Sequence, residues 1–502
     1  MSMYNMGRVG FIYFFLFSNA VLFGQKDPVA VQYGELVSLT ELKENLTIIA
    51  SDALEGRKTG SRGQKMAAAF IRAHFEEIGL QGPVGNGGYY QNVPLYAVVP
   101  GKASMNTATT ALENLRDFVF LGLTESKGIS PVVFVGDGEE ASLEKIEVSG
   151  KVVLVISEKR VSGIPVAELL TKGAKAILIC NSSDEATFSA FANRAKKSFD
   201  SRRMTLSRPS GSGDLESVVY VSPSAVEKIL DTEFSVLKSY ASDPKKIKRI
   251  RKVKEGSINY FLRNEIKQVN SENVLGYLEG SDKKDELIVV TSHYDHIGKL
   301  SEGTGDLINN GADDDGSGTV AVLQMAKVFA KAKEEGNGPR RSMLFMTVTG
   351  EEMGLFGSQY YAENPVFPLS NTVVDLNIDM IGRTDPEHKG KPDYVYVIGS
   401  DKLSQELHQI SETINSTYTQ LDFDYTYNDE NHPTNLYKRS DHWNFAKNGI
   451  PIVFYFDGIH EDYHLPSDEV DKIDFELLTK RTKLVFYTAW ELANRDERIK
   501  ND

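Results

Sequence analysis

The sequence predicts an α/β protein: a three-layer α/β/α domain with a mixed, mostly parallel sheet, plus an inserted β-rich module. From about residue 270 onward, apolar runs suited to buried strands alternate with stretches of helical character. Between about residues 95 and 225, short β-rich runs separated by Gly, Ser and Asp dominate instead. Alternating strands and helices with near-continuous apolar strands indicate a sheet covered by helices on both faces. Ligands bind such sheets beyond the carboxyl ends of the strands, where we expect the functional site.

The composition is that of a globular protein. The chain has 502 residues, of which 41% are hydrophobic and 25% charged, and at roughly 150 residues per domain this length suggests two or three domains. The net charge of −14 argues against a nucleic-acid partner. Cys180 is the single cysteine, which excludes an intrachain disulfide and a cysteine-based zinc site. Any metal would have to be held by His, Asp and Glu.

The first 24 residues differ from the rest of the chain. After Arg8, residues 9–24 carry no charge, and small residues such as Ala20 and Gly24 lie near the end of this run. The run is shorter than the roughly 20 residues that a membrane-spanning helix needs. It therefore predicts a secretory signal peptide over residues 1–24 and a protein exported to the periplasm or secreted, without a stable membrane anchor after cleavage. The alternative is an uncleaved membrane anchor.

The remaining chain divides into three expected segments. Residues 25–95 form the N-terminal part of the main domain, 96–255 the inserted module and its linker, and 256–502 the main part. Within the first segment, apolar residues recur at helical spacing over 36–80. In the main part, strands are expected at 287–293, 342–350, 372–380, 394–399 and 451–456. Helices are expected at 317–335, 354–363, 402–415 and 474–495.

Polar side chains gather where these expected strands end. The clusters lie at 292–296, 311–318, 350–354, 377–380 and 460–464. Each alone has a structural explanation, such as a turn or a helix cap. Together, they would place several carboxylates and imidazoles in one cleft, where a cation is needed to balance them. Since a cysteine-based site is excluded, the ligands would be a mixture of His and carboxylate side chains. Such a mixture favours zinc, with manganese or cobalt as substitutes.

Five motifs in these clusters resemble those of the M28 family of metallopeptidases. They are HYD at 293–295, GADDDGSG at 311–318, GEEMGLFGS at 350–358, NIDMIG at 377–382 and YHLPSD at 463–468. Upstream, LEGRKTGSRG at 54–63 and YYQNVPLY at 89–96 resemble the N-terminal segment of that family. The inserted module is similar to a protease-associated domain, through its runs at 132–138, 149–155 and 171–179.

The resemblance implies a site with two zinc ions. By motif position, the five metal ligands would be His293, Asp314, Glu352, Asp379 and His464. Asp314 would bridge the ions, with His293 and Asp379 completing one site and Glu352 and His464 the other. Asp295 would hold the free N–H of the His293 ring. The family also places a cis peptide bond after the bridging aspartate, here between Asp314 and Asp315.

The expected chemistry is hydrolysis of a peptide bond by a metal-bound hydroxide. Two divalent ions about 3.5–4 Å apart lower the pKa of a shared water toward neutrality. Glu351 cannot easily ligate beside Glu352, because neighbouring side chains diverge, so we expect it to act as the general base. Tyr463 matches a tyrosine that, in some aminopeptidases of the family, donates a hydrogen bond to the developing oxyanion. The alternative for Tyr463 is a packing role in its loop.

The sequence allows cleavage at the amino end or at the carboxyl end of a peptide. Aminopeptidase activity is the first expectation, because acidic residues around the metals would attract a substrate ammonium group. A carboxypeptidase or dipeptidase would need a cation for the terminal carboxylate, which Arg383 or Arg439 could supply. A glutaminyl cyclase or a non-catalytic, receptor-like relative fits less well, because all five ligand positions and Glu351 are intact. The sequence leaves open whether the protein is a monomer or a homodimer.

Overall fold

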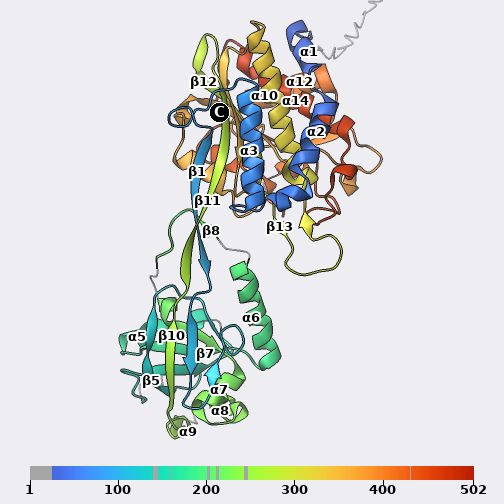
Figure 1. Cartoon of the computed structure of the whole chain (residues 1–502). Helices are drawn as coiled ribbons and strands as arrows, with labels where there is room; N and C mark the ends of the chain where they lie inside the picture. The colour runs from blue at the N-terminus through green and yellow to red at the C-terminus, as the bar shows by residue number, and fades with distance from the viewer. Residues whose placement is uncertain are drawn as a thin grey trace, which may run out of the picture.

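The computed structural model describes residues 25–138, 145–159, 161–200, 204–210, 214–241, 247–429 and 431–502. The predicted signal peptide lies outside these residues. The described chain forms two parts, which lie one above the other in Figure 1, and each is built around its own large sheet. In this part of the chain, no helix combines the length and the apolar character that crossing a membrane requires.

The larger part contains a nine-stranded mixed sheet. In spatial order its strands are β18 (Asp422–Asp424), β17 (Tyr394–Ile398), β19 (Ile452–Phe456), β16 (Thr372–Ile378), β12 (Lys283–His293), β15 (Arg341–Val348), β11 (Glu265–Leu278), β1 (Tyr90–Val99) and β8 (Met204–Thr205). The central strands β19, β16, β12 and β15 are parallel, as are β17 and β18 at one edge. The pairs β17–β19, β11–β15, β1–β11 and β1–β8 are antiparallel. The expected strands are confirmed, and the parallel arrangement is concentrated at the centre.

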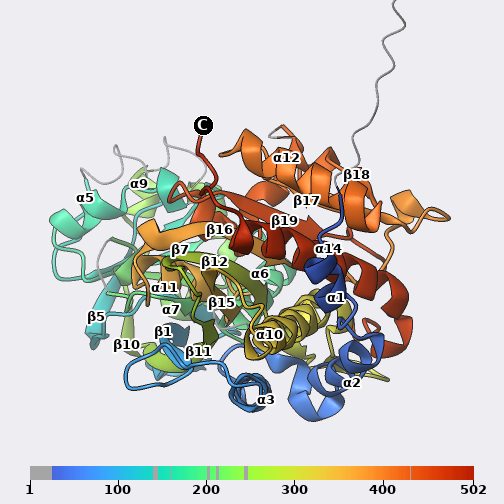
Figure 2. The ribbon, with the colours of Figure 1, turned by 90° about the horizontal axis from the view of Figure 1, so that it is seen from above.

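Helices cover both faces of this sheet, as the sequence predicts. Alternate residues of β12 face opposite ways: Ile288 and Val290 pack into one apolar cluster, and Leu287 and Val289 into another. The first cluster includes side chains from α1 (Pro28–Gly34), α2 (Leu39–Ile49), α3 (Arg62–Glu77), α10 (Gly318–Glu334), α12 (Gln405–Ile414) and α14 (Phe475–Asn494). The second includes side chains from α11 (Phe356–Glu363) and α13 (Trp443–Ala446). Figure 2 shows α10 and α14 on one side of the sheet and α11 on the other.

The smaller part has an eight-stranded sheet of its own. Its strands, in spatial order, are β3 (Ala111–Leu112), β2 (Ala103–Asn106), β10 (Gly256–Leu262), β5 (Ser126–Phe134), β6 (Val152–Ile156), β7 (Ala176–Cys180), β9 (Val218–Val221) and β4 (Phe118–Phe120). The helices of this part are α5 (Val166–Thr171), α6 (Glu185–Asp200), α7 (Pro223–Leu230), α8 (Phe234–Ala241) and α9 (Ile247–Ile250). The sequence analysis placed 256–262 in the main domain, whereas this segment forms β10 of the smaller sheet. The reason is that Ile258, Tyr260 and Leu262 face the apolar core of that sheet.

A long antiparallel ribbon of β1 and β11 connects the two parts (Figure 1). The two strands pair over ten residues, from Tyr90 opposite Val274 to Val99 opposite Glu265. The far ends of the ribbon lead directly into β2 and out of β10 of the smaller sheet. The insertion therefore leaves and re-enters the main domain through adjacent strands.

Candidate active site

The carboxyl ends of neighbouring parallel strands bring the predicted site residues together. Strand β12 ends at His293, and it lies between β15 and β16, with His293 opposite Val348 of β15. Glu351 and Glu352 follow β15, and Asp379 follows β16 directly. Because these strands are parallel, the three chain ends meet at one edge of the sheet.

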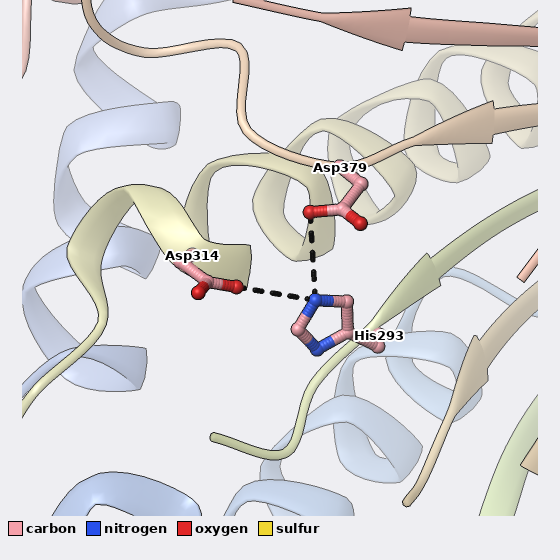
Figure 3. A group of neighbouring side chains, drawn as sticks. All are labelled: His293, Asp314 and Asp379. Atoms are coloured by element: carbon pink, nitrogen blue, oxygen red, sulfur yellow. Dashed lines mark ion pairs between the residues drawn. The ribbon is translucent and has the colours of Figure 1, made fainter. Parts of the chain in front are cut away.

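One group of donors surrounds the ring of His293. Its Nε2 lies 3.3 Å from Oδ1 of Asp314 and 3.5 Å from Oδ1 of Asp379 (Figure 3). Its Nδ1 lies 3.0 Å from the main-chain carbonyl of Asp295, which can only accept a hydrogen bond. That bond places a proton on Nδ1, so Nε2 is the ring atom that faces the two carboxylates and could bind a cation. Burial lowers the pKa of His293, but Asp379 and Glu351 outweigh it and raise that pKa well above its ordinary value.

A second group of donors lies on the other side of Asp314. Nε2 of His464 is 3.1 Å from Oδ2 of Asp314 and 3.1 Å from Oε2 of Glu352. His296 also belongs to this group, because its Nδ1 lies 2.7 Å from Oε1 of Glu352 and 3.7 Å from Oδ2 of Asp314. The two oxygens of Asp314 therefore face two different groups of donors. A single carboxylate placed in this way is suited to bridge two cations.

The chemistry of these donors fits zinc. Within 4.8 Å of one another, ligand atoms come from His293, Asp314 and Asp379 in one group and from His296, Asp314 and Glu352 in the other. Imidazole nitrogens and carboxylate oxygens are ordinary zinc ligands. Among the described residues, Oδ2 of Asp314 and Nε2 of His464 are buried and, although 3.1 Å apart, are not joined by a hydrogen bond. Buried polar atoms are seldom left in this state, so a cation between them would supply the missing interaction.

The loop that carries Asp314 is held from several sides. The carboxylate of Asp468 accepts hydrogen bonds from the backbone N–H groups of Asp313 and Asp314, each at 3.1 Å. Gly311, at the start of this loop, has φ of 56°, and a Cβ there would lie 2.5 Å from the ring of His296. Only glycine therefore suits this position. The peptide bond between Asp314 and Asp315 is cis, as the family resemblance implies.

Asp315 connects three of the segments that form the site. Its Oδ2 accepts from the backbone N–H of His293 at 3.2 Å, and its Oδ1 accepts from those of Gly318 and Met380 at 2.9 and 3.1 Å. It thereby ties the end of β12, the start of α10 and the segment after β16 to one carboxylate. The sequence analysis did not single out this role, because a third consecutive aspartate is equally typical of a turn or a cap.

Arg57 explains why the N-terminal segment belongs with the site. Its side chain is fully buried, with Nε donating to the carbonyl of Tyr294 at 2.8 Å. Its Nη1 and Nη2 donate to the carbonyls of Asn310 and Gly311, at 2.6 and 2.9 Å. One guanidinium thus fixes the chain after β12 and the loop before Asp314. This residue lies inside the LEGRKTGSRG motif that the sequence analysis noted.

Ser440 holds the carboxylate of Asp379. Its Oγ donates to Oδ2 of Asp379 at 2.6 Å and accepts from Nδ2 of Asn377 at 3.0 Å. All three side chains are buried, so the carboxylate has one defined orientation. Neither the bond from Ser440 to Asp379 nor the contact of His296 with Glu352 was predicted from the sequence, which suggested only that His296 lies near the cleft. The only signals available were their positions beside Arg439 and in the His293–His296 run.

Asp295 differs from the prediction in the atom that contacts His293. The sequence analysis expected its carboxylate to hold the ring, but that group lies 4.0 Å from Nδ1, and the main-chain carbonyl takes its place. The carboxylate instead accepts from Oγ1 of Thr59 at 2.6 Å and from the backbone N–H of Glu351 at 3.2 Å. Burial raises the pKa of Asp295 to about 6. Asp295 therefore positions Glu351 as well as His293.

Glu351 and Tyr463 both line the pocket next to His293. Oε2 of Glu351 lies 3.9 Å from Nε2 of His293, and burial raises the pKa of Glu351 well above its ordinary value. The ring of Tyr463 stacks on that of His464, with centroids 3.9 Å apart. Burial, reinforced by Asp314, raises the pKa of the Tyr463 hydroxyl, so the group keeps its proton at neutral pH. Both residues thus line one pocket with His293, and their roles as general base and oxyanion donor stay predictions.

The rest of the pocket wall is mostly apolar. The side chains concerned are Met380, Leu436, Phe454, Phe456 and Ile459. Arg439 also lines the pocket, as expected for a residue that contacts substrate. Arg383 does not: it is only 9% exposed, and its Nη2 is bound to Oδ2 of Asp462 at 3.0 Å. The expectation that Arg383 contacts substrate is therefore not supported, because a buried carboxylate already occupies its guanidinium.

Comparisons with known proteins match the part of the chain that carries these residues. Residues 273–489 match the model of peptidase family M28. A probable zinc metalloprotease of Leptosphaeria maculans is 26% identical over 260 residues, covering 45% of this chain and 58% of that protein. Aminopeptidase YwaD of Bacillus subtilis is 26% identical over 240 residues, covering 46% of each chain. This chain thus spans about half the length of the curated relatives it matches.

The fold agrees with that of a solved aminopeptidase. The aminopeptidase from Aneurinibacillus sp. strain AM-1 superposes with a TM-score of 0.50 at 18% identity, and the match covers 94% of this chain and 97% of that one. The shared fold extends well beyond residues 273–489. The match to peptidase family M28 covers residues 273–489, the part of the chain that carries the site residues described above.

Proposed function

We propose that this protein is a zinc-dependent aminopeptidase that removes residues from the N-terminus of peptides. The observation that carries the proposal is the position of Asp314, whose Oδ1 lies 3.3 Å from His293 and whose Oδ2 lies 3.1 Å from His464. Asp314 would bridge two zinc ions. His293 and Asp379 would complete one site, and Glu352 and His464 the other. Manganese or cobalt could substitute, since both accept the same ligands.

Bound zinc would lower the pKa of water and polarise the carbonyl of the substrate. Glu351 would act as the general base, accepting the proton of the attacking water and passing it to the leaving amine. The backbone N–H of Glu351 donates to the carboxylate of Asp295 at 3.2 Å. The side chain of Glu352 lies with the second group of donors, and its Oε2 is 3.1 Å from Nε2 of His464. A carboxylate whose pKa is raised by burial is a stronger proton acceptor than an exposed one.

Tyr463 would stabilise the carbonyl oxygen as it becomes negative. Its hydroxyl keeps its proton at neutral pH and has no hydrogen-bond partner among the described residues, so it is available as a donor. Its ring is fixed by stacking on His464. A preorganised donor of this kind stabilises charge that develops only in the transition state.

The amino end of the peptide is the favoured point of attack. Glu351 and Asp379 both line the pocket, and their negative charge would attract the ammonium group of a free N-terminus. The names of two relatives, aminopeptidase YwaD and a probable leucine aminopeptidase of Trichophyton verrucosum, support this choice. An N-terminal acetyl group would remove the attraction.

Hydrolysis of paired peptides tests the proposal. Purified protein is given peptides with free and with acetylated N-termini, before and after zinc is removed by a chelator. We expect the free peptides alone to be cleaved, the activity to be lost with the chelator, and zinc to restore it. Equal cleavage of free and acetylated peptides would contradict the assignment as an aminopeptidase. Activity that persists after removal of all metal would contradict the metal dependence.

Export is a separate part of the proposal, supported by the uncharged run over residues 9–24. We propose that this run directs the protein to the periplasm or the medium and is then removed. Mass spectrometry of the mature N-terminus checks this. A mature protein that begins near residue 21 or 25 agrees with the proposal, and one that retains residues 1–24 contradicts it.

A further inference from the structure

Arg439 lines a pocket whose other side chains are mostly acidic, apolar or aromatic. The same pocket is lined by the carboxylates of Glu351 and Asp379 and by the apolar side chains of Leu436 and Phe454. Among the described residues that line this pocket, Arg439 is the only Lys or Arg. A guanidinium stays protonated at any physiological pH, so this position carries a permanent positive charge.

The guanidinium of Arg439 differs from those of the buried arginines in having no partner among the described residues. Arg57, Arg341, Arg383 and Arg481 each donate to carbonyls or carboxylates inside the protein. For Arg439, the described part of the chain shows no such ion pair or side-chain hydrogen bond, although carboxylates lie in the same pocket. Its five donors are therefore available to a ligand.

The backbone around Arg439 is nevertheless well fixed. The short helix η10 (Leu436–Lys438) precedes it, and its backbone N–H donates to the carbonyl of Leu436 at 3.0 Å. The next residue is Ser440, whose Oγ is bound to Asp379 at 2.6 Å. Arg439 thus lies on a hydrogen-bonded segment, directly before Ser440, which holds the proposed metal ligand Asp379.

We propose that Arg439 binds a carboxylate of the peptide substrate. The inference rests on the proposed function and adds a substrate class to it. A planar guanidinium binds a carboxylate through two parallel hydrogen bonds, which a lysine cannot reproduce. The carboxylate can come from the C-terminus of a short peptide or from an acidic side chain. Arg383, the other arginine that the sequence indicates, does not line this pocket, and its Nη2 is bound to Asp462.

Two matched pairs of peptides distinguish these sources. The first pair is leucyl-glycine and leucyl-glycinamide, which differ in the C-terminal carboxylate. The second is glutamyl-glycinamide and glutaminyl-glycinamide, which differ in the side-chain carboxylate. For each pair, kcat/KM is measured with the zinc-loaded full chain, and the ratio of the charged to the neutral peptide is taken. The same ratios are measured for Arg439→Gln, Arg439→Lys and Lys438→Gln.

We expect Arg439→Gln to lower the ratio of one pair by about tenfold, as for a charge-assisted hydrogen bond that is partly exposed. Arg439→Lys should restore part of the ratio, because it keeps the charge but not the paired geometry. The peptide pair whose ratio falls shows whether Arg439 binds the C-terminal carboxylate or the side-chain carboxylate. Lys438 is an exposed neighbour whose ammonium lies 5.3 Å from the ring of Trp443, so Lys438→Gln should change neither ratio.

Other outcomes overturn the inference. If the peptides are hydrolysed but neither ratio changes in Arg439→Gln, the carboxylate contact is wrong and the proposed function stands. If zinc-loaded wild-type protein hydrolyses none of the four peptides, the proposed function and the inference fail together. Thermal unfolding and zinc content of each variant show that it is folded. Should Arg439→Gln fail to fold, an unchanged ratio in Arg439→Lys overturns the inference in its place.

Discussion

Replacing Ser440 with alanine tests whether Asp379 holds a metal ion in the orientation seen here. The Oγ of Ser440 donates to Oδ2 of Asp379 at 2.6 Å, and both side chains are buried. Ser440→Ala removes this donor and leaves a buried carboxylate oxygen without it. A hydrogen bond to a charged group contributes about 1.5–3 kcal/mol, which corresponds to about 10- to 150-fold in a binding constant. We therefore expect zinc to bind about 10- to 150-fold more weakly at the site of His293 and Asp379.

The assay is competition for zinc between the metal-free protein and a chromophoric chelator. Ser404→Ala is the matched control, because Ser404 is also buried and its Oγ accepts from the backbone N–H of Leu407 at 3.2 Å, far along the chain from the site. It should leave zinc affinity unchanged. If Ser440→Ala and Ser404→Ala bind zinc as tightly as the wild type, Ser440 does not position a ligand and the reasoning fails.

Three further predictions follow from the same structure. Glu351→Gln should keep its zinc, measured by mass spectrometry of the metal, but lose at least about 100-fold in turnover; a fully active variant would show that Glu351 is not the base. His296→Ala removes the contact of 2.7 Å between Nδ1 of His296 and Oε1 of Glu352. It should weaken the binding of one zinc ion by about 10- to 100-fold in a chelator titration. Unchanged binding of both ions would show that His296 does not support a zinc site. Burial lowers the pKa of His442 from 6.5 to about 3, so below about pH 6.5 the unfolded chain takes up a proton that the folded protein does not, and stability falls as pH drops. Between pH 7 and 4.5, wild type should lose about 2.5 kcal/mol more unfolding free energy than His442→Phe in urea titrations; equal losses would mean that His442 is not buried in its neutral form.

The strands that form the site could be predicted because they are apolar on both faces. The run at 287–293 lies within β12, and those at 372–380 and 451–456 contain β16 and β19. A sheet covered on both faces requires such runs, and parallel strands bring their carboxyl ends to one edge. The closeness of His293 and Asp379 follows from these two facts, whereas Asp314 lies on the loop before α10.

The ribbon of β1 and β11 was harder to predict. Its outer half carries polar residues such as Glu265, Gln268 and Asn270, because it extends between the two parts and has little core to cover. The predicted boundary at 255 lies too early in the chain, because Ile258, Tyr260 and Leu262 face the apolar core of the smaller sheet. Residues 256–262 continue the smaller sheet before the chain returns along β11.

The contacts around the ligands depend on side-chain directions that sequence spacing does not fix. Spacing placed Asp295 beside His293, but the main-chain carbonyl of Asp295 makes the contact, because its carboxylate is held by Thr59. Spacing also could not distinguish Arg383 from Arg439. The structure distinguishes them, because Arg439 lines the pocket whereas Arg383 forms an ion pair with Asp462.

The central claim is that the carboxylate of Asp314 is shared by two metal ions. Zinc titrated into metal-free wild-type protein and into Asp314→Asn, followed by isothermal calorimetry, tests it most directly. The account predicts two zinc ions per wild-type chain and weakened binding at both sites in the variant. A variant that keeps one site at full affinity, or a wild-type chain that binds a single ion, would contradict it.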